Sequence, residues 1–408
     1  MPQTSLTTFP TAPPAVTATA PPAVAAGIDV GGTTLHVALV TDSADVLITK
    51  TVPTEPTPQT SLETAAAVIA DLCANQGLNI TDLTGIGVGI PGLVAPDGTV
   101  RHAVNLGIGS EPYPLASTLA ALTNLPVQVN NDVNVGALGL AFFYSHHTLE
   151  MTPEHYVSHI NEPSGEKLAD LAYVAIGTGL GVGMILNGRL RQGVIVDGEI
   201  GHIPIDPAGP QCGCGQRGCI EMYASGSAAA RLWPHGKEGE HAAAALFRAA
   251  SAGDPAAIAA RNTFCDGIAT AIRVIVLTMG VHCVVLGGGV RDIGEVLMDE
   301  VKRALERDAE TSRFIESLDL ISRVDLVPQG VPTGAIGAAA LLLVDLTQPL
   351  PTPSAMAIRP ASVGVTAMED GSSVQDGTAV ENSNAVRPTV TAHPTATAHP
   401  TQKGRCDE

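Results

Sequence analysis

Three cysteines and one histidine lie close together in the sequence. Cys212, Cys214 and Cys219 fall within eight positions, and His202 precedes the first of them by ten residues. The glycines between them allow the backbone to turn sharply enough to direct three sulfur atoms at one centre. This pattern predicts a zinc site, and four protein ligands would make the metal structural. A disulfide or unpaired thiols are the alternatives, and a reducing compartment disfavours the disulfide.

Three glycine-rich segments each follow an apolar run that predicts a strand. They are Asp29–Thr34, Gly177–Gly181 and Gly287–Gly289. Glycine lets backbone N–H groups approach a phosphate closely, and threonine hydroxyls add hydrogen-bond donors without charge. One such segment is more often a turn than a site, but three of them predict a nucleotide across a cleft between two lobes. The sequence contains neither a Walker A motif nor a complete dinucleotide fingerprint, which disfavours the P-loop and Rossmann folds.

An Asn-Asn-Asp run at residues 130–132 lies between the predicted strand Val127–Val129 and the predicted helix Val135–Phe142. Asn131 or Asp132 could cap that helix by accepting hydrogen bonds from its first free N–H groups. Asp132 could also act as a general base that accepts a hydroxyl proton during phosphoryl transfer. Such a base mainly orients the attacking oxygen, so a carboxylate kept ionised by the helix dipole would suit the task without a raised pKa. The two interpretations are compatible.

Alternating strand and helix patterns must position these groups, and they predict an α/β fold. A glycine turn at residues 31–32 separates two strand patterns, and Pro91-Gly92 ends a third. A helix is expected after the capping-box pair Thr60 and Glu63, with Gly77 just beyond its end. With Val127–Val129, the predicted strands are Ala25–Val30, Leu35–Val40, Gly85–Ile90, Leu171–Ile176, Val182–Leu186, Cys283–Leu286 and Val324–Val327. A final apolar helix is predicted at Ala335–Val344.

The composition excludes several classes of partner. The 408-residue chain has 40 acidic and 21 basic side chains, a net charge of −19, which would repel nucleic acid and anionic membranes. The first 26 residues carry no charge and so lack the basic region of a secretory signal, and no apolar run is judged long enough to span a bilayer. A cytoplasmic protein without nucleic-acid or membrane partners is therefore expected.

The order of the motifs closely resembles the ROK family of repressors and sugar kinases, within the actin-like ATPase superfamily. The motifs are Asp-Val-Gly-Gly-Thr, Asn-Asp, Gly-Thr-Gly-Leu-Gly-Val-Gly, Gly-Glu-Ile-Gly-His, Cys-Gly-Cys-Gly-Gln-Arg-Gly-Cys-Ile-Glu and a late Gly-Gly-Gly. The resemblance runs from about residue 27 to residue 343. It implies two ribonuclease-H-like lobes around a central cleft, with ATP and a sugar between them and Mg²⁺ bridging the phosphates. A dimer or tetramer is also implied.

The resemblance also assigns roles to residues. Asp132 would be the catalytic base, His202 would join the zinc ion to the sugar, and the further sugar contacts would be Asn105, Asn131, Glu199 and Glu221. The nucleotide would be bound by Gly31, Gly32, Thr33, Thr34, Gly177, Thr178, Gly179, Gly287, Gly288 and Gly289. The implied reaction is ATP-dependent phosphorylation of a hexose, most simply glucose to glucose 6-phosphate. N-acetylmannosamine, N-acetylglucosamine, fructose and cyclitols remain alternative substrates.

One position departs from the family pattern. Many family kinases have lysine after the first Gly-Gly-Thr, whereas this chain has Thr34 and no basic residue before Lys50. A sugar-binding protein without catalysis is therefore a competing hypothesis. A sugar-responsive regulator is another, but only 28 residues, without lysine or arginine, precede Asp29.

The sequence also suggests domain boundaries. Residues 1–23 and 347–408 are rich in Pro, Thr and Ala and predict disordered arms. An N-terminal lobe would span residues 24–138 and a C-terminal lobe residues 139–330, with the zinc loop at residues 202–219. A helix within 331–346 would pack back on the N-terminal lobe.

Overall fold

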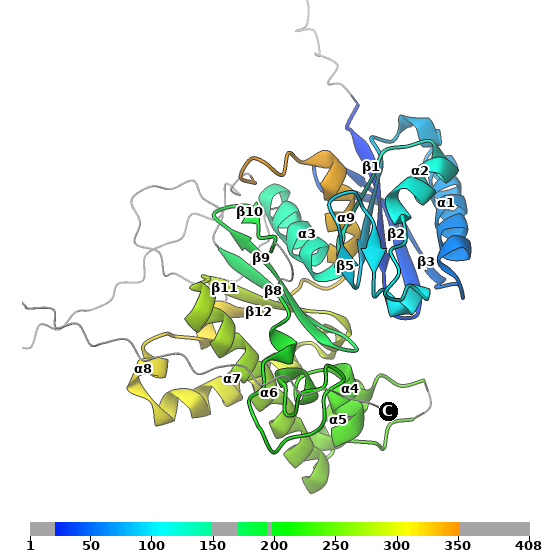
Figure 1. The fold of residues 1–408 in the computed structure, drawn as a ribbon. Helices are drawn as coiled ribbons and strands as arrows, with labels where there is room; N and C mark the ends of the chain where they lie inside the picture. Colours follow the sequence, from blue (N-terminus) through cyan, green and yellow to red (C-terminus); the bar gives the residue numbers. More distant parts are fainter. Residues whose placement is uncertain (1–20, 148–169, 194–197, 238, 351–408) are drawn as a thin grey trace, which may run out of the picture. The chain divides into compact units, whose positions relative to one another are not determined.

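The computed structural model describes residues 21–147, 170–193, 198–237 and 239–350 (Figure 1). Almost all of the two predicted arms lies outside these residues.

The first sheet contains five strands in the order β3-β2-β1-β4-β7. Their bounds are β1 Val24–Val30, β2 Thr34–Thr41, β3 Val46–Pro53, β4 Ile86–Ile90 and β7 Val127–Asn131. The first three strands pair antiparallel, whereas β4 and β7 continue the sheet parallel to β1. Parallel strands bring their carboxyl ends to one edge, so the Gly31 turn, Gly92 and Asn131 lie along the same edge.

The second sheet repeats this arrangement in the order β10-β9-β8-β11-β12. Its strands are β8 Leu171–Ile176, β9 Leu180–Leu186, β10 Arg189–Leu190, β11 Cys283–Gly287 and β12 Val324–Leu326. Again three antiparallel strands are followed by two parallel ones. Two copies of one strand order are the ribonuclease-H-like lobes that the motifs predicted (Figure 1).

Separate helices cover the outer faces of the two sheets. Helices α1 and α2 pack on the first sheet, and α5, α6 and α7 share a core with the second. The bounds are α1 Pro58–Asn75, α2 Leu115–Thr123, α4 Gly226–Leu232, α5 Ala242–Ser251, α6 Pro255–Met279, α7 Glu295–Thr311 and α8 Arg313–Glu316. Strands β5 Leu93–Val94 and β6 Val100–Arg101 pair as a separate two-stranded antiparallel sheet. Short 3-10 helices cover residues 80–82, 104–106, 200–202, 220–222, 289–293 and 321–323.

Helices α3 (Asp132–His146) and α9 (Thr333–Leu343) pack against each other between the two sheets. Helix α9 contacts β1 and β4, whereas α3 contacts β8 and β9. One apolar core joins both helices to residues of β1, β2, β8 and β9. Glycine makes this approach possible. A Cβ on Gly139 would lie 2.0 Å from the Thr333 carbonyl oxygen, and one on Gly337 would lie 1.7 Å from that of Val135. Because α3 runs from Asp132 to His146, the predicted domain boundary after residue 138 falls inside this helix.

The predicted start of the first helix is wrong by one turn. The N-cap is Thr57, whose side chain accepts a hydrogen bond from the Thr60 N–H at 3.2 Å, and Pro58 occupies the first turn. Proline needs no N–H partner there and its ring fixes a helical φ, so the helix begins before the predicted pair Thr60 and Glu63. The other end is as predicted, because Gly77 follows the C-cap with a φ of +68°.

Helix α6 corrects the expectation that no apolar segment is long enough to cross a bilayer. Its 25 residues are long and apolar enough by length and composition, as in no other described helix. However, half of its most apolar window is buried, and residues such as Phe264 and Ile272 lie within the core of the second sheet. The burial explains the apolar composition of this helix.

We expect Gly337→Ala to destabilise the protein by about 2 to 4 kcal/mol, because its Cβ would overlap the backbone of α3 and force the helices apart. Denaturant unfolding measures the effect. Gly109→Ala is the matched control, since nothing lies within 4 Å of a Cβ at that position. Equal free energies of unfolding for the two variants would contradict this account of the helix contact.

Candidate active site

Two of the three glycine segments form equivalent turns in the two sheets. Gly31–Thr33 connects β1 to β2, and Gly177–Gly179 connects β8 to β9. The third, Gly287–Gly289, lies at the carboxyl end of β11. Gly288 has a φ of +74°, and a Cβ there would lie 2.5 Å from the Ile176 carbonyl oxygen. The second and third segments therefore lie side by side.

The start of helix α4 packs on the second glycine turn. The Gly226 N–H donates to the Gly177 carbonyl oxygen at 2.7 Å, and the Ser227 hydroxyl donates to that of Thr178 at 2.8 Å. These bonds fix the shape of the turn through backbone carbonyl groups. The turn is therefore held in place before any ligand binds.

Thr34 is connected to a histidine that the sequence analysis did not single out. The Thr34 hydroxyl lies 3.2 Å from Nε2 of His36, and the Thr51 hydroxyl lies 2.9 Å from Nδ1. Burial lowers the pKa of His36, so the ring is neutral at pH 7. Lys50 is turned toward α1, where it pairs with Asp71 at 3.3 Å. Neither His36 nor Lys50 therefore supplies the positive charge that a lysine at position 34 would provide.

Asn131 is the N-cap of α3, and Asp132 is the first residue of the helix. The Asn131 side-chain oxygen accepts from the Val133 N–H at 3.1 Å, and its amide nitrogen donates to the Gly92 carbonyl oxygen at 3.3 Å. Asn131 therefore performs the capping role that the sequence left open between the two residues. The Asp132 carboxyl group is not the N-cap, although the Val133 and Asp132 N–H groups also interact with it.

The Asp132 carboxyl group has a raised pKa of about 6. Loss of water around the group is the largest cause, the N–H groups of Val133 and Asp132 oppose the shift, and the Glu199 carboxylate adds to it. Burial therefore outweighs the first-turn N–H groups, yet a pKa of about 6 still leaves the carboxylate mostly ionised at pH 7.

Asp29, at the end of β1, interacts electrostatically with Asp132. Burial, together with the Asp132 carboxylate, raises the pKa of Asp29 to about 7. A Cβ on Gly334, in the first turn of α9, would lie 2.2 Å from an Asp29 oxygen. Asp29 opens the first glycine segment, and no role was predicted for it from the sequence. Its position directly before Val-Gly-Gly was the available signal.

Tyr173 is a buried residue that sequence reasoning missed altogether. Its ring, on β8, lies between Gly136 of α3 and Gly287 of β11, where added Cβ atoms would come within 2.4 and 2.3 Å of it. The phenol shares hydrogen bonds with the Thr333 side chain and the Gly288 backbone. Burial, followed by the Asp29 and Asp132 carboxylates, raises the pKa of Tyr173, so the phenol stays neutral. It links the third glycine segment to the start of α9.

The predicted metal ligands converge. One ligand atom from each of His202, Cys212, Cys214 and Cys219 lies within 4.8 Å of the others. The Cys212 sulfur is 3.6 Å from His202 Nδ1, and the Cys214 and Cys219 sulfurs are 3.7 Å apart. Tetrahedral zinc, with Zn–S bonds of about 2.3 Å and a Zn–N bond of about 2.0 Å, separates its ligand atoms by roughly 3.5 to 3.8 Å. The four residues therefore fit zinc.

Glu199 lies on the other side of the His202 ring. Its carboxylate is 3.8 Å from Nε2, whereas Nδ1 faces the Cys212 sulfur. Gly198 sets this position: its φ is +74°, and a Cβ there would lie 1.8 Å from the Val182 carbonyl oxygen. The histidine ring therefore connects the cysteine cluster to a carboxylate.

Glu221 and Asn105 complete the predicted set. One Glu221 oxygen accepts a hydrogen bond from the Leu180 N–H at 3.1 Å, beside the second glycine turn. Glu221 also lies close enough to Glu199 to contribute to the raised pKa of that residue, after burial as the main cause. Asn105 falls in the turn Val104–Leu106, and its side chain is outside the described part of the chain.

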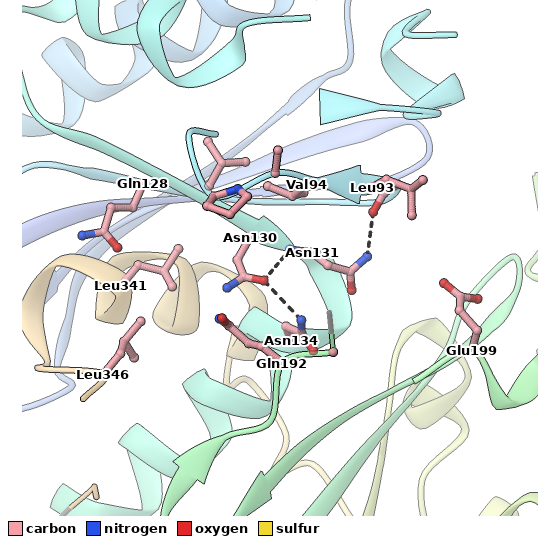
Figure 2. A pocket seen from close by; sticks show the side chains of 15 residues that line it. Leu93, Val94, Gln128, Asn130, Asn131, Asn134, Gln192, Glu199, Leu341 and Leu346 are labelled. Atoms are coloured by element: carbon pink, nitrogen blue, oxygen red, sulfur yellow. Dashed lines mark hydrogen bonds between the residues drawn. The ribbon is translucent and has the colours of Figure 1, made fainter. Parts of the chain in front are cut away.

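A cavity of about 390 Å³ adjoins this group (Figure 2). Glu199 borders it on one side, and Figure 2 shows Asn130, Asn131 and Asn134 between Glu199 and Gln128. Asp132, His202 and Glu221 are not among the residues that line it. Glu199 is therefore the point at which the cavity adjoins the cluster of acidic residues.

The family profile of ROK proteins matches residues 25–152 and 161–344 of this chain. The chain belongs to the ROK family. The glucokinase of Halalkalibacterium halodurans is 32% identical over 312 residues, which cover 71% of this chain and 88% of that protein. The N-acetyl-D-glucosamine kinase of Yersinia pseudotuberculosis is 28% identical, over 78% of this chain and 99% of that one.

Solved structures agree with the fold. A ROK glucokinase from Streptomyces griseus, determined with glucose and AMPPNP, is 26% identical, has a TM-score of 0.60 and covers 78% of this chain and 98% of its own. The fold of this ROK protein is therefore the two-lobed actin-like fold, as the sequence predicted. The relatives support a ROK sugar kinase.

The raised pKa values give folding stability a defined pH dependence. A carboxyl group with a folded pKa of about 6 contributes stability that is complete below its unfolded pKa and is lost as pH rises through 6. Between pH 5 and 8 the wild type should therefore lose about 1 kcal/mol relative to Asp132→Asn.

Urea unfolding across that pH range measures the difference. The exposed variant Asp71→Asn serves as the control and should track the wild type. Parallel stability curves for the wild type and Asp132→Asn would contradict a raised pKa at Asp132.

Proposed function

We propose that this ROK protein transfers the γ-phosphoryl group of ATP to a hexose hydroxyl, with glucose as substrate and glucose 6-phosphate as product. The observation that carries the proposal is the electrostatic group formed by Asp132, Glu199 and Asp29 beside the glycine turns. Carboxylates accept hydrogen bonds from hydroxyls, so a polyhydroxyl substrate suits them. The glucokinase relatives support the choice of glucose.

Asp132 is the proposed general base. With a pKa of about 6, its carboxylate is mostly ionised at pH 7 and can accept the proton of the attacking hydroxyl. Phosphoryl transfer proceeds through a loose transition state, so the main contribution of Asp132 is to orient that oxygen. Asn131 supports it by capping the same helix turn.

Glu199, His202 and Glu221 are the proposed sugar contacts, together with Asn131 and Asn105. The carboxylate of Glu199 stands 3.8 Å from His202 Nε2, so the two groups can share neighbouring hydroxyls. Glu221 also binds the Leu180 N–H, which would tie sugar binding to the second glycine turn. A stereochemically selective site needs several such fixed acceptors.

The three glycine segments are the proposed nucleotide site. Gly31–Thr34 and Gly177–Gly179 would receive the phosphates, and Gly287–Gly289 the adenosine. Mg²⁺ prefers carboxylate oxygen, and the Asp29 carboxyl group beside the first turn fits that preference. When bound, Mg²⁺ would neutralise phosphate charge, a need increased by the absence of a lysine at position 34.

A structural zinc ion is proposed for the cluster of His202, Cys212, Cys214 and Cys219. Its ligand spacing fits tetrahedral coordination, and its fixed position would hold the His202 ring toward the sugar. The zinc ion thereby supports substrate binding without taking part in the reaction.

N-acetylglucosamine is the second candidate substrate. The relative from Yersinia pseudotuberculosis is named for it and matches 99% of its own length. Its acetamido group differs from the glucose hydroxyl in size and hydrogen bonding, so competition between the two sugars for the same site distinguishes them directly.

Asp132→Asn should lower kcat for glucose by about a hundred- to ten-thousandfold while glucose still binds, because the amide keeps its shape but cannot accept the proton. ADP release measured with glucose and a panel of hexoses and amino sugars gives both the activity and the substrate. Asp71→Asn, on the surface of α1, should retain wild-type turnover. Substantial turnover by Asp132→Asn would refute the base, and no ADP release with any sugar would refute the kinase.

Freshly purified protein should contain about one zinc ion per chain, measured by plasma emission spectrometry. Cys219→Ser should lower this content below half an equivalent and raise the KM for glucose, since the His202 ring loses its anchor. Cys283→Ser lies outside the cluster and should retain the metal. Less than half an equivalent in unchelated wild type would exclude the proposed site.

A further inference from the structure

Five carboxamide side chains make up most of the polar lining of the cavity beside Glu199, and its other walls are glycine and apolar residues. Gln128 and Asn130 project from β7, Asn134 from the first turn of α3, and Gln192 from the segment after β10 (Figure 2). Glu199 is the only charged residue among the described residues that line it. A cavity of about 390 Å³ is within the range of small-molecule sites.

Much of this hydrogen-bonding capacity is unused within the described part of the chain. Asn130 Oδ1 accepts from the Asn131 N–H at 2.8 Å and from Asn134 Nδ2 at 3.2 Å. That pairing orients both amides and leaves Asn130 Nδ2 and Asn134 Oδ1 without partners among the described residues. The side chains of Gln128 and Gln192 likewise have none there. The cavity therefore offers both donors and acceptors, and the hydrogen bond between the two asparagines holds their amides in place.

These groups select the chemistry of an occupant. A phosphate or carboxylate would find no cation among the described lining residues and would be repelled by Glu199. An acetamido group offers one N–H and one carbonyl, fewer than the cavity can bind. A sugar ring carries several hydroxyls, each a donor and an acceptor, and its C–H face can pack on Leu341 and Leu346.

We propose that the cavity is a subsite for a second, neutral sugar unit attached to the hexose that is phosphorylated. This inference rests on the proposed kinase function, because it places the reacting ring beside Asp132 and His202. Those residues do not line the cavity, whereas Glu199 and Asn131, both proposed contacts of the reacting hexose, belong to both places. A disaccharide can therefore span Glu199, with one ring at the carboxylates and the other among the amides.

Calorimetric titration of the full chain with glucose, maltose, cellobiose, trehalose and sucrose tests the subsite without requiring turnover. At least one disaccharide should bind as tightly as glucose. Gln128→Leu and Gln192→Leu should each weaken its binding relative to glucose by about five- to tenfold, because each removes hydrogen bonds and keeps the volume. Gln59→Leu, on the exposed side of α1, should leave that ratio unchanged.

The outcomes separate the two proposals. If glucose is phosphorylated but all four disaccharides bind more than tenfold more weakly than glucose, the subsite is wrong and the kinase stands. An unchanged ratio in both cavity variants also overturns the subsite. If no sugar yields ADP, but disaccharide binding is lost in the cavity variants, the kinase is wrong and the cavity remains a binding site for a second sugar unit.

Discussion

The backbone contact between α3 and α9 is the constraint on which the rest of the structure depends. The two helices approach through Gly139 and Gly337, with no room for a side chain between them. Helix α9 rests on the first sheet and α3 on the second, so this contact fixes one sheet relative to the other. Because Asp132 begins α3, the same contact also sets how its carboxyl group meets Asp29 and Glu199.

Charge is concentrated where the two sheets meet, and burial makes it costly. Asp29 and Asp132 both have raised pKa values because water is excluded around them and negative charges lie nearby. Such a pair is stabilised by a cation or by hydroxyl donors, which is what a magnesium nucleotide and a sugar would bring. Raised pKa values of this kind are typical of functional sites, and the surrounding packing maintains them.

The cysteine cluster and the carboxylates are coupled through one imidazole ring. His202 presents Nδ1 to the Cys212 sulfur and Nε2 to Glu199, so the position of the cluster determines the position of the acceptor. Glu221 makes the second connection, from the end of the same loop to the Leu180 N–H. A loop without regular secondary structure thereby acquires a fixed geometry.

The sequence by itself determined the strand pattern, the three glycine segments and the Cys-His cluster, because periodicity, glycine and metal-ligand spacing are local properties. It did not determine that Thr57 caps α1, since Pro58 decides that start, nor that burial would raise the pKa of Asp132. The tertiary structure alone placed Tyr173 between two glycines, brought Asp29 within the electrostatic influence of Asp132 and formed the cavity beside Glu199. Each of these depends on residues far apart in the chain, and only packing of the two sheets brings them together.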